Sequence, residues 1–136
     1  MSDWNTNVID EFRANQGKVG GYFEGKNLLL LHTRGRKSGA ERVNPLAYRM
    51  VGDTYAVFGS KGGDPEHPDW IHNVAANPDV EVEVGTERFN GKAEVLWEGP
   101  TRDEIYAAQA ADWESFGEYE EKTDRKIPVV LIERLS

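Results

Sequence analysis

The chain has 136 residues, 38% of them hydrophobic and none of them cysteine, and its formal net charge at pH 7 is -8. This length suits one hydrophobic core, so we expect a single domain over residues 1–136. The lack of thiols excludes disulfides, thiolate metal ligands and cysteine nucleophiles. The acidic surface argues against a nucleic acid partner, because it repels phosphates.

The N-terminal segment has the spacing of an amphipathic helix. Its apolar residues are Trp4, Val8, Ile9 and Phe12. They predict a helix over about residues 3–16 that stops at Gly17 and packs on the core; a membrane or partner surface is the alternative. No signal peptide is visible, and the longest apolar run, Leu28–Leu31, is too short to span a bilayer. We therefore expect a cytoplasmic protein, with membrane association through this helix as the alternative.

Three strand-like segments follow: Asn27–Thr33, Arg42–Met50 and Thr54–Phe58. The first is continuously apolar at its centre, which is typical of a strand buried on both faces. Pro45 in the second indicates a bulge or an edge position, because proline has no N–H to donate to a neighbouring strand.

The second half of the chain alternates helices with strands. In chain order we expect a helix from about Pro68 to before Asn77, strands Val80–Val84 and Arg88–Trp97, a helix from Thr101 to about Trp113, and a final strand Pro128–Ile132. Proline suits the first turn of a helix, and Thr101 with Glu104 has the spacing of a capping box. Gly91 lies inside a long strand and is expected to bend it.

This order of elements predicts an α+β fold: a mostly antiparallel split β-barrel of about six strands with about three covering helices. A barrel of six strands is too narrow for an open channel, so side chains should fill its interior. A ligand would then bind outside, against the loops.

The turn between the first two strands is strongly basic. Residues 32–49 contain Arg34, Arg36, Lys37, Arg42 and Arg49 against the single acidic residue Glu41. Glycines on either side of Ser38 let the backbone approach a ligand, and amide and hydroxyl donors with cationic side chains favour an anion. The alternative is a solvated hairpin tip.

A glycine-rich loop from Ser60 to Pro65 precedes the helix expected at Pro68. Such a loop before a helix N-terminus can bind an anion or the polar edge of a ring. Trp70 and Asn73 are three residues apart and share a helical face. They could hold a planar ligand, or Trp70 could anchor the core while Asn73 caps the loop.

Conventional catalytic groupings are weak. His67 and His72 are five apart and do not share a helical face, and His32 has no carboxylate partner that the sequence fixes. We therefore expect no metal site. The lack of an acid–base dyad argues against a hydrolase and leaves room for cofactor chemistry.

The segment Trp113–Lys122 is aromatic and acidic. Its aromatic side chains could form a lid over an apolar substrate or cover an open end of the barrel. The sequence leaves both interpretations open.

Three sequence blocks in this order and spacing resemble the deazaflavin-dependent nitroreductase family. They are Thr33–Gly39 with Arg42–Leu46, then Pro68–Pro78, then Thr123–Val130. The family consists of actinobacterial split-barrel proteins that use reduced coenzyme F420. The resemblance runs from about Leu28 to the C-terminus and implies an oxidoreductase that transfers hydride from this coenzyme to a conjugated acceptor, such as a quinone or a nitroaromatic.

The resemblance also implies roles for individual residues. The coenzyme's phosphodiester and acidic tail would contact Arg36, Lys37, Ser38 and Arg42, and its groove would be lined by Pro45 and Leu46. Ser60 and its neighbour Lys61 would border the deazaflavin ring near the carbon that carries the hydride. Trp70 and Asn73 would lie at the other side of the cofactor. Tyr119 would face the acceptor, and either Tyr119 or a water would supply the proton.

The chain departs from nitroimidazole-activating relatives at three positions. Ala47 replaces a tyrosine, Lys122 replaces an aromatic residue, and Phe116 lacks the hydroxyl of the corresponding tyrosine. Quinones are therefore the expected acceptors. An FMN-binding split-barrel oxidoreductase and a non-catalytic deazaflavin carrier are the alternatives, and the sequence does not indicate an oligomeric state.

Overall fold

The computed structural model describes residues 3–20, 27–35, 39–60 and 66–135. Its elements, in chain order, are α1 (Asp3–Ala14), β1 (Leu28–Arg34), β2 (Glu41–Val51), β3 (Thr54–Phe58), α2 (Asp69–Ala76), β4 (Asp79–Val84), β5 (Glu87–Leu96), α3 (Pro100–Asp112), α4 (Glu114–Lys122) and β6 (Val129–Arg134).

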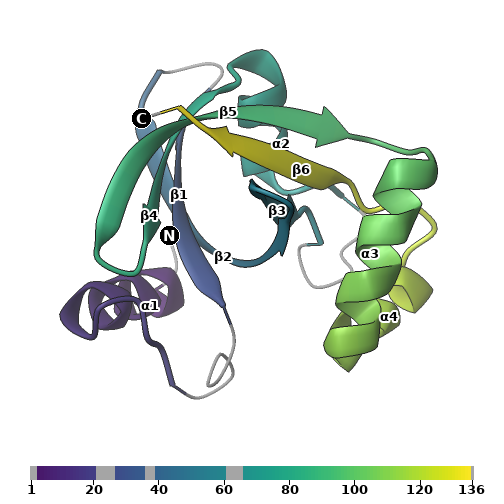
Figure 1. Cartoon of the computed structure of the whole chain (residues 1–136), viewed down its shortest axis with the longest axis horizontal. Helices are drawn as coiled ribbons and strands as arrows, with labels where there is room; N and C mark the ends of the chain where they lie inside the picture. The colour runs from purple at the N-terminus through teal and green to yellow at the C-terminus, as the bar shows by residue number, and fades with distance from the viewer. Residues whose placement is uncertain (1–2, 21–26, 36–38, 61–65, 136) are drawn as a thin grey trace.

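Six antiparallel strands close into a barrel in the order β1-β2-β3-β6-β5-β4. This confirms the predicted antiparallel barrel. The helices lie around it, with α1 on one side and the α3–α4 pair on the other (Figure 1). Among the described residues, no helix has the length and the apolar character needed to cross a bilayer.

Side chains fill the barrel interior, as expected for six strands. Successive side chains of a strand point to opposite faces, and on β1 Leu29 and Leu31 join the interior cluster while Leu28 and Leu30 point outward. Every strand contributes to the interior cluster, which also contains Trp70, Ile71 and Val74 of α2. Helix α2 therefore belongs to the barrel core.

Two apolar clusters cover the outer face of the barrel. Helices α3 and α4 pack over β3 and β6 through a cluster that includes Phe58, Tyr106 and Phe116. Helix α1 packs over β1 through Val8 and Phe12, of which Phe12 is only 1% exposed. The packing interpretation of the N-terminal helix is thus confirmed for these two residues. The side chain of Trp4 lies outside the described part of the chain.

One element was not anticipated and one local prediction was wrong. The segment after Trp113 forms a fourth helix, α4, whose buried residue Phe116 lies among Phe58, Tyr106 and Trp113. The expected capping box at Thr101 is absent, because α3 begins one residue earlier, at Pro100, with Gly99 as its N-cap and no side-chain cap. Proline at the first helical turn makes such a cap less necessary, since it has no N–H to satisfy.

Gly91 gives the first testable prediction. A Cβ on this residue of β5 would lie 2.7 Å from Cγ2 of Ile132 and 3.2 Å from the carbonyl oxygen of Glu133. We expect Gly91→Ala to lower the free energy of unfolding by about 1–3 kcal/mol through overpacking, measured by urea denaturation. Gly117→Ala in α4 is the control, because its Cβ would meet nothing closer than 3.9 Å. Equal stability of the two variants would contradict the crowding at Gly91.

Candidate functional site

Strand β2 changes its neighbours halfway along its length. Residues 41–47 pair with β1 on one side, whereas residues 48–51 pair with β3. No described strand pairs with the second edge of residues 41–47. The barrel is closed, but β2 extends beyond its pairing with β3, and we call residues 41–47 the open edge.

The hydrogen-bond pattern determines which backbone groups face this opening. The amide of Tyr48 donates to the carbonyl of Asn27, 3.2 Å away, so the backbone groups of Tyr48 point toward β1. Antiparallel pairs alternate, so the backbone groups of Val43, Pro45 and Ala47 point to the open side. Pro45 has no N–H to leave unpaired there, which confirms the edge position predicted for it.

The basic turn connects β1 to the start of the open edge. Gly39 has a φ of +74°, and its amide donates to the carbonyl of Gly35 at 2.8 Å. Arg42 is exposed, and within the described residues no carboxylate pairs with it. Arg36, Lys37 and Ser38 lie outside the described residues, as does Lys61, so the roles expected for them stay predictions.

Arg49 does not belong with the other basic residues. It lies at the far half of β2, where it donates to Gln109 and pairs with Asp112 of α3 at 2.9 Å. The positive charge that remains for a ligand is therefore concentrated at the turn end of the strand.

Ser60 follows β3 on the other side of the opening. The Gly59 amide donates to the carbonyl of Pro128 at 3.0 Å, and a Cβ on Gly59 would lie 2.7 Å from Cδ1 of Ile71. The chain can therefore pass this close to α2 only with glycine at position 59. Ser60 itself is held through its carbonyl, which accepts a hydrogen bond from Arg125 at 2.8 Å.

The outward side of β2 and helix α4 pack against the same apolar cluster. Ala47 and Tyr119 are both partly buried against the outer cluster that contains Phe58 and Phe116. The ring of Phe116 lies 5.2 Å from that of Tyr119. Phe116 covers the barrel, and Tyr119 lies beside it with Ala47 at the same cluster, whereas Lys122 is exposed at the end of α4.

Three residues that were expected to contact the cofactor lie in the barrel core or pack against it. Leu46 packs against the interior cluster, Trp70 belongs to it, and Asn73 is 4% exposed. Trp70 thus has the packing role that the sequence left open. The cofactor contacts expected of Leu46, Trp70 and Asn73 stay predictions.

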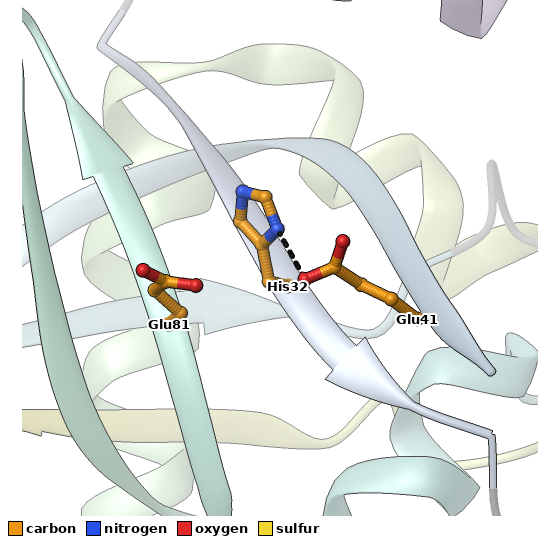
Figure 2. Close-up of side chains that lie close together, drawn as sticks. All are labelled: His32, Glu41 and Glu81. Carbon is orange, nitrogen blue, oxygen red and sulfur yellow. Dashed lines mark hydrogen bonds and ion pairs between the residues drawn. The ribbon is translucent and has the colours of Figure 1, made fainter. Parts of the chain in front are cut away.

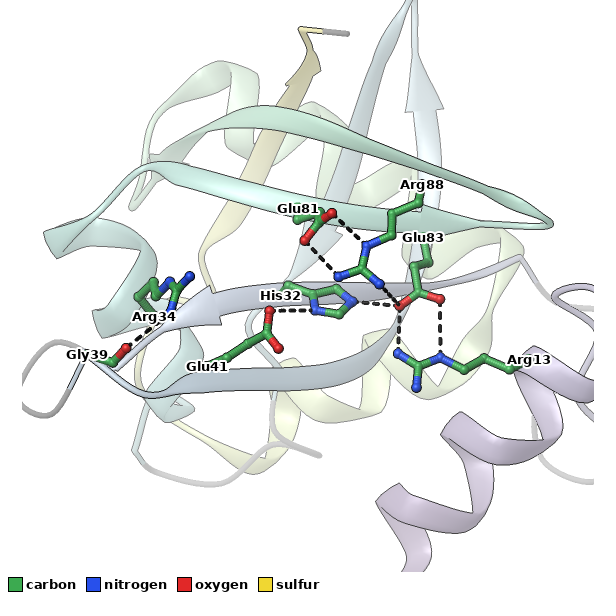
Figure 3. A network of polar contacts seen from close by, with 8 residues as sticks. All are labelled: Arg13, His32, Arg34, Gly39, Glu41, Glu81, Glu83 and Arg88. Atoms are coloured by element: carbon green, nitrogen blue, oxygen red, sulfur yellow. Dashed lines mark hydrogen bonds and ion pairs between the residues drawn. The ribbon is translucent and has the colours of Figure 1, made fainter.

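A network of charged side chains joins β1, β2, β4, β5 and α1 (Figure 3). His32 is 5% exposed, and its Nδ1 and Nε2 lie 3.2 Å and 2.6 Å from carboxylate oxygens of Glu41 and Glu83. Glu83 also accepts a bidentate pair of hydrogen bonds from Arg13 of α1. The network therefore connects the first residue of the open edge, Glu41, to the N-terminal helix.

Sequence reasoning did not find these partners of His32. Glu83 is 51 residues away from it, and only the pairing of β1 with β4 brings the two strands together. The alternation of Glu81 and Glu83 with apolar residues indicated one solvated face, but not what that face contacts.

One part of this network has the composition of a metal site. Ligand atoms of His32, Glu41 and Glu81 lie within 4.8 Å of one another (Figure 2). Each of these residues already has a partner, however, because Arg88 donates to both oxygens of Glu81 and His32 contacts two carboxylates. A cation would have to displace these contacts, so the cluster is better described as an ion-pair network.

The network also sets the acidity of Glu83. Burial alone would raise the pKa of this carboxyl, but the hydrogen bonds from Arg13 and His32 outweigh burial and hold the pKa below its usual range. Glu83 is therefore a carboxylate at neutral pH, and its negative charge strengthens the hydrogen bonds from Arg13 and His32.

Comparison with known proteins gives a consistent result. The model of a family described as F420H(2)-dependent quinone reductase matches residues 4–134. An F420H(2)-dependent quinone reductase of Mycobacterium tuberculosis (strain ATCC 25618 / H37Rv) is 39% identical over 132 residues, which cover 90% of this chain and 85% of that protein.

Solved structures agree with the sequence comparison. An F420-H2 dependent reductase, FDR-A, is 38% identical and has a TM-score of 0.71 over 84% of this chain and all of that one. A chain described as a domain-swapped dimer is 37% identical, with a TM-score of 0.72 over 96% and 98% of the two chains. The heme storage protein HutZ of Vibrio cholerae, 15% identical with a TM-score of 0.63, shares the fold alone.

Glu83 gives the second prediction. We expect Glu83→Gln to lower the free energy of unfolding by about 1–3 kcal/mol at pH 7, because charge-assisted hydrogen bonds from Arg13 and His32 are weakened. The folded-state pKa of Glu83 is depressed, so its contribution is present above the ordinary value of 4.5 and is lost as the pH falls through the folded value. The difference from wild type should therefore shrink below about pH 4.5.

Glu81→Gln is the matched control, and urea denaturation over a pH series makes the comparison. Its side chain is 35% exposed, against 12% for Glu83, and its partner Arg88 is half exposed. Such a surface pair contributes about 0–1 kcal/mol. A Glu83→Gln effect no larger than that of Glu81→Gln would contradict the assigned network.

Proposed function

Because the chain belongs to the F420H(2)-dependent quinone reductase family, we propose that reduced coenzyme F420 binds along the open edge of β2 and reduces a quinone there. The protein is an oxidoreductase. When bound, the coenzyme supplies the hydride, and the quinone becomes a hydroquinone as it accepts this hydride and a proton. The observation that carries the proposed location is the open edge itself, with Arg42 at one end and Ser60 across it.

The donors of the open edge suit an anionic, ring-containing cofactor. Arg42 supplies a positive charge without a competing carboxylate among the described residues. The backbone N–H groups of Val43 and Ala47 point to the open side and can donate to polar ring atoms. Arg36, Lys37 and Ser38 of the basic turn would complete the contacts to the phosphodiester and the acidic tail.

The outward face of Ala47 and the ring of Tyr119 are proposed to border the acceptor. Both pack against the same apolar cluster, which suits a flat, conjugated molecule better than a charged one. The methyl side chain of Ala47 leaves room where a tyrosine would project. Phe116 is buried beneath Tyr119 and would support the site without offering a hydroxyl.

In this proposal the main contribution of the protein is to position the coenzyme and the acceptor, and it supplies few reactive groups. Holding the ring and the acceptor in contact makes hydride transfer effectively unimolecular, and the apolar cluster excludes water from one side of the pair. Ser60 borders the ring near the carbon that carries the hydride, and Tyr119 faces the acceptor as the proposed proton donor.

The remaining expectations concern the N-terminal helix and the location of the protein. Val8 and Phe12 are used in packing α1 on the barrel, so a membrane contact by this helix would have to use other residues. We propose that α1 serves mainly to hold the barrel and the charged network. The cytoplasmic location stays a prediction.

Titration with oxidised coenzyme F420 and, in parallel, with FMN tests the proposed cofactor. We expect selective binding of the deazaflavin in the micromolar range, as several charge-assisted contacts of about 1.5–3 kcal/mol can provide. Preference for FMN would move the chemistry to the flavin oxidoreductases. Binding of the coenzyme without reduction of any quinone would favour a carrier.

Arg42 gives the third prediction. Arg42→Ala should raise the Kd for oxidised coenzyme F420 about tenfold, because one charge-assisted contact to the phosphate or tail is lost. The measurement is quenching of coenzyme fluorescence on binding. Arg49→Ala is the control on the same strand, since Arg49 is paired with Gln109 and Asp112. Equal Kd values for wild type and Arg42→Ala would contradict the proposal that the phosphate end of the coenzyme binds at the open edge.

Tyr119 gives the fourth prediction. Tyr119→Phe should leave the Kd for the coenzyme unchanged and lower kcat for quinone reduction by at least about 10²-fold, because a positioned proton donor contributes on this order. Tyr55→Phe makes the same chemical change at a ring packed against the barrel interior and should leave kcat unchanged. An unchanged kcat in Tyr119→Phe would assign proton delivery to water.

A further inference from the structure

Arg125 joins two residues that are far from it along the chain. Its Nη2 donates to the carbonyl oxygen of Ser60 at 2.8 Å, and its Nη1 donates to Nδ1 of His67 at 2.9 Å. Arg125 lies in the segment between α4 and β6, which is part of the third sequence block of the family resemblance but received no role in the site. One guanidinium therefore holds both Ser60 and His67.

The guanidinium completes the support of Ser60. On the side of β3 the chain is already held, because Gly59 donates to Pro128 and lies against Ile71. Beyond Gly59, the carbonyl of Ser60 accepts the hydrogen bond from Arg125. Arg125 therefore holds the backbone at Ser60 from a second direction.

His67 is adapted to accept this hydrogen bond. A guanidinium has no acceptor atom, so Nδ1 of His67 is the acceptor and the ring proton lies on Nε2. Burial lowers the pKa of His67, and the charge of Arg125 and the neighbouring His72 lower it further. The ring is thus kept neutral, which is the form that can accept from a cation.

The other edges of the His67 ring are packed. Its centroid lies 5.3 Å from that of Trp97 and 5.8 Å from that of His72, both in edge-on arrangements. Trp97, which follows β5, and His72 of α2 therefore restrict the orientation of the His67 ring. Because Arg125 contacts both Ser60 and His67, it links Ser60 to Trp97 and His72 through the His67 ring.

We propose that Arg125 is a positioning residue for hydride transfer: by holding the Ser60 carbonyl and the His67 ring at once, it fixes Ser60 beside the deazaflavin ring. This inference rests on the proposed function, which places Ser60 at the ring. A planar guanidinium can bond two acceptors in fixed directions, whereas an ammonium acts as a single point charge. Arginine, and not merely a positive charge, is therefore needed at position 125.

The test compares Arg125→Gln and Arg125→Lys with wild type and with Lys126→Ala. Lys126 is the next residue, is half exposed, and pairs with Asp103 at 3.6 Å, away from Ser60 and His67. For each protein three quantities are measured: the Kd for oxidised coenzyme F420, kcat for quinone reduction, and the pH midpoint of the His67 ring by NMR without coenzyme.

We expect both Arg125 variants to lower kcat about 10- to 100-fold, since small displacements of positioning groups have effects of this size. The Kd should rise less than kcat falls, because Arg42 and the basic turn still bind the anionic end. In Arg125→Gln the His67 midpoint should move upward, because a neighbouring positive charge is gone. Lys126→Ala should match wild type in all three measurements.

Other outcomes separate the possible failures. An inactive wild type would refute the proposed function, whereas an active wild type with equal kcat in the Arg125 variants would refute the positioning role alone. A residue that only stabilises the fold would lower Tm and leave the kcat and Kd of the folded protein unchanged. If Arg125→Gln does not fold, Arg125→Lys carries the comparison, and wild-type values of kcat and Kd there would overturn the inference.

Discussion

The unpaired half of β2 is the constraint on which the rest of the site depends. Backbone N–H and C=O groups need hydrogen-bond partners, and a closed barrel normally provides them on both sides of every strand. Here β2 exchanges β1 for β3 as its main neighbour, so part of its second side lacks a described strand. Arg42 lies near one end of this stretch, and Ala47 at its other end packs against the outer cluster that Tyr119 of α4 also contacts.

The charges of this acidic protein are distributed in two ways. Most of the arginines that the structure describes are engaged: Arg13 with Glu83, Arg49 with Asp112, and Arg88 with Glu81. These pairs hold helices and strands together. Arg42 differs because no described carboxylate competes for it. Positive charge is therefore available to an anionic ligand at the turn, although the chain as a whole carries a net charge of -8.

The sequence was most informative where local chemistry decides the structure. Pro45 predicted an edge because it lacks a donor, and the apolar centre of β1 predicted a strand buried on both faces. The fourth helix was missed because Gly117 and the mixture of aromatic and acidic residues hide its periodicity, and its stability comes from burial of Phe116 against α3 and β3. Arg49 was counted with the basic turn, since its contacts with α3 depend on tertiary packing.

Contacts between segments that are far apart in the sequence could not be predicted either, because they depend on tertiary packing. The contact of His32 with Glu83 and both contacts of Arg125 join residues 51 to 65 positions apart, and only strand register and loop packing bring them together. The family resemblance supplied the cofactor and the expected contacts, but it did not separate Leu46 and Trp70, which pack in the core, from Arg42 and Tyr119, which do not.

The strict alternation along β2 has an evolutionary consequence. Leu46 and Tyr48 pack against the interior cluster, whereas Ala47 between them packs against the outer cluster. In the proposed site, substitutions at outward positions would therefore change the surface that the acceptor meets, while the residues that maintain the barrel stay the same. A scaffold of this kind can change its chemistry by single substitutions, and each variant along the way can still fold.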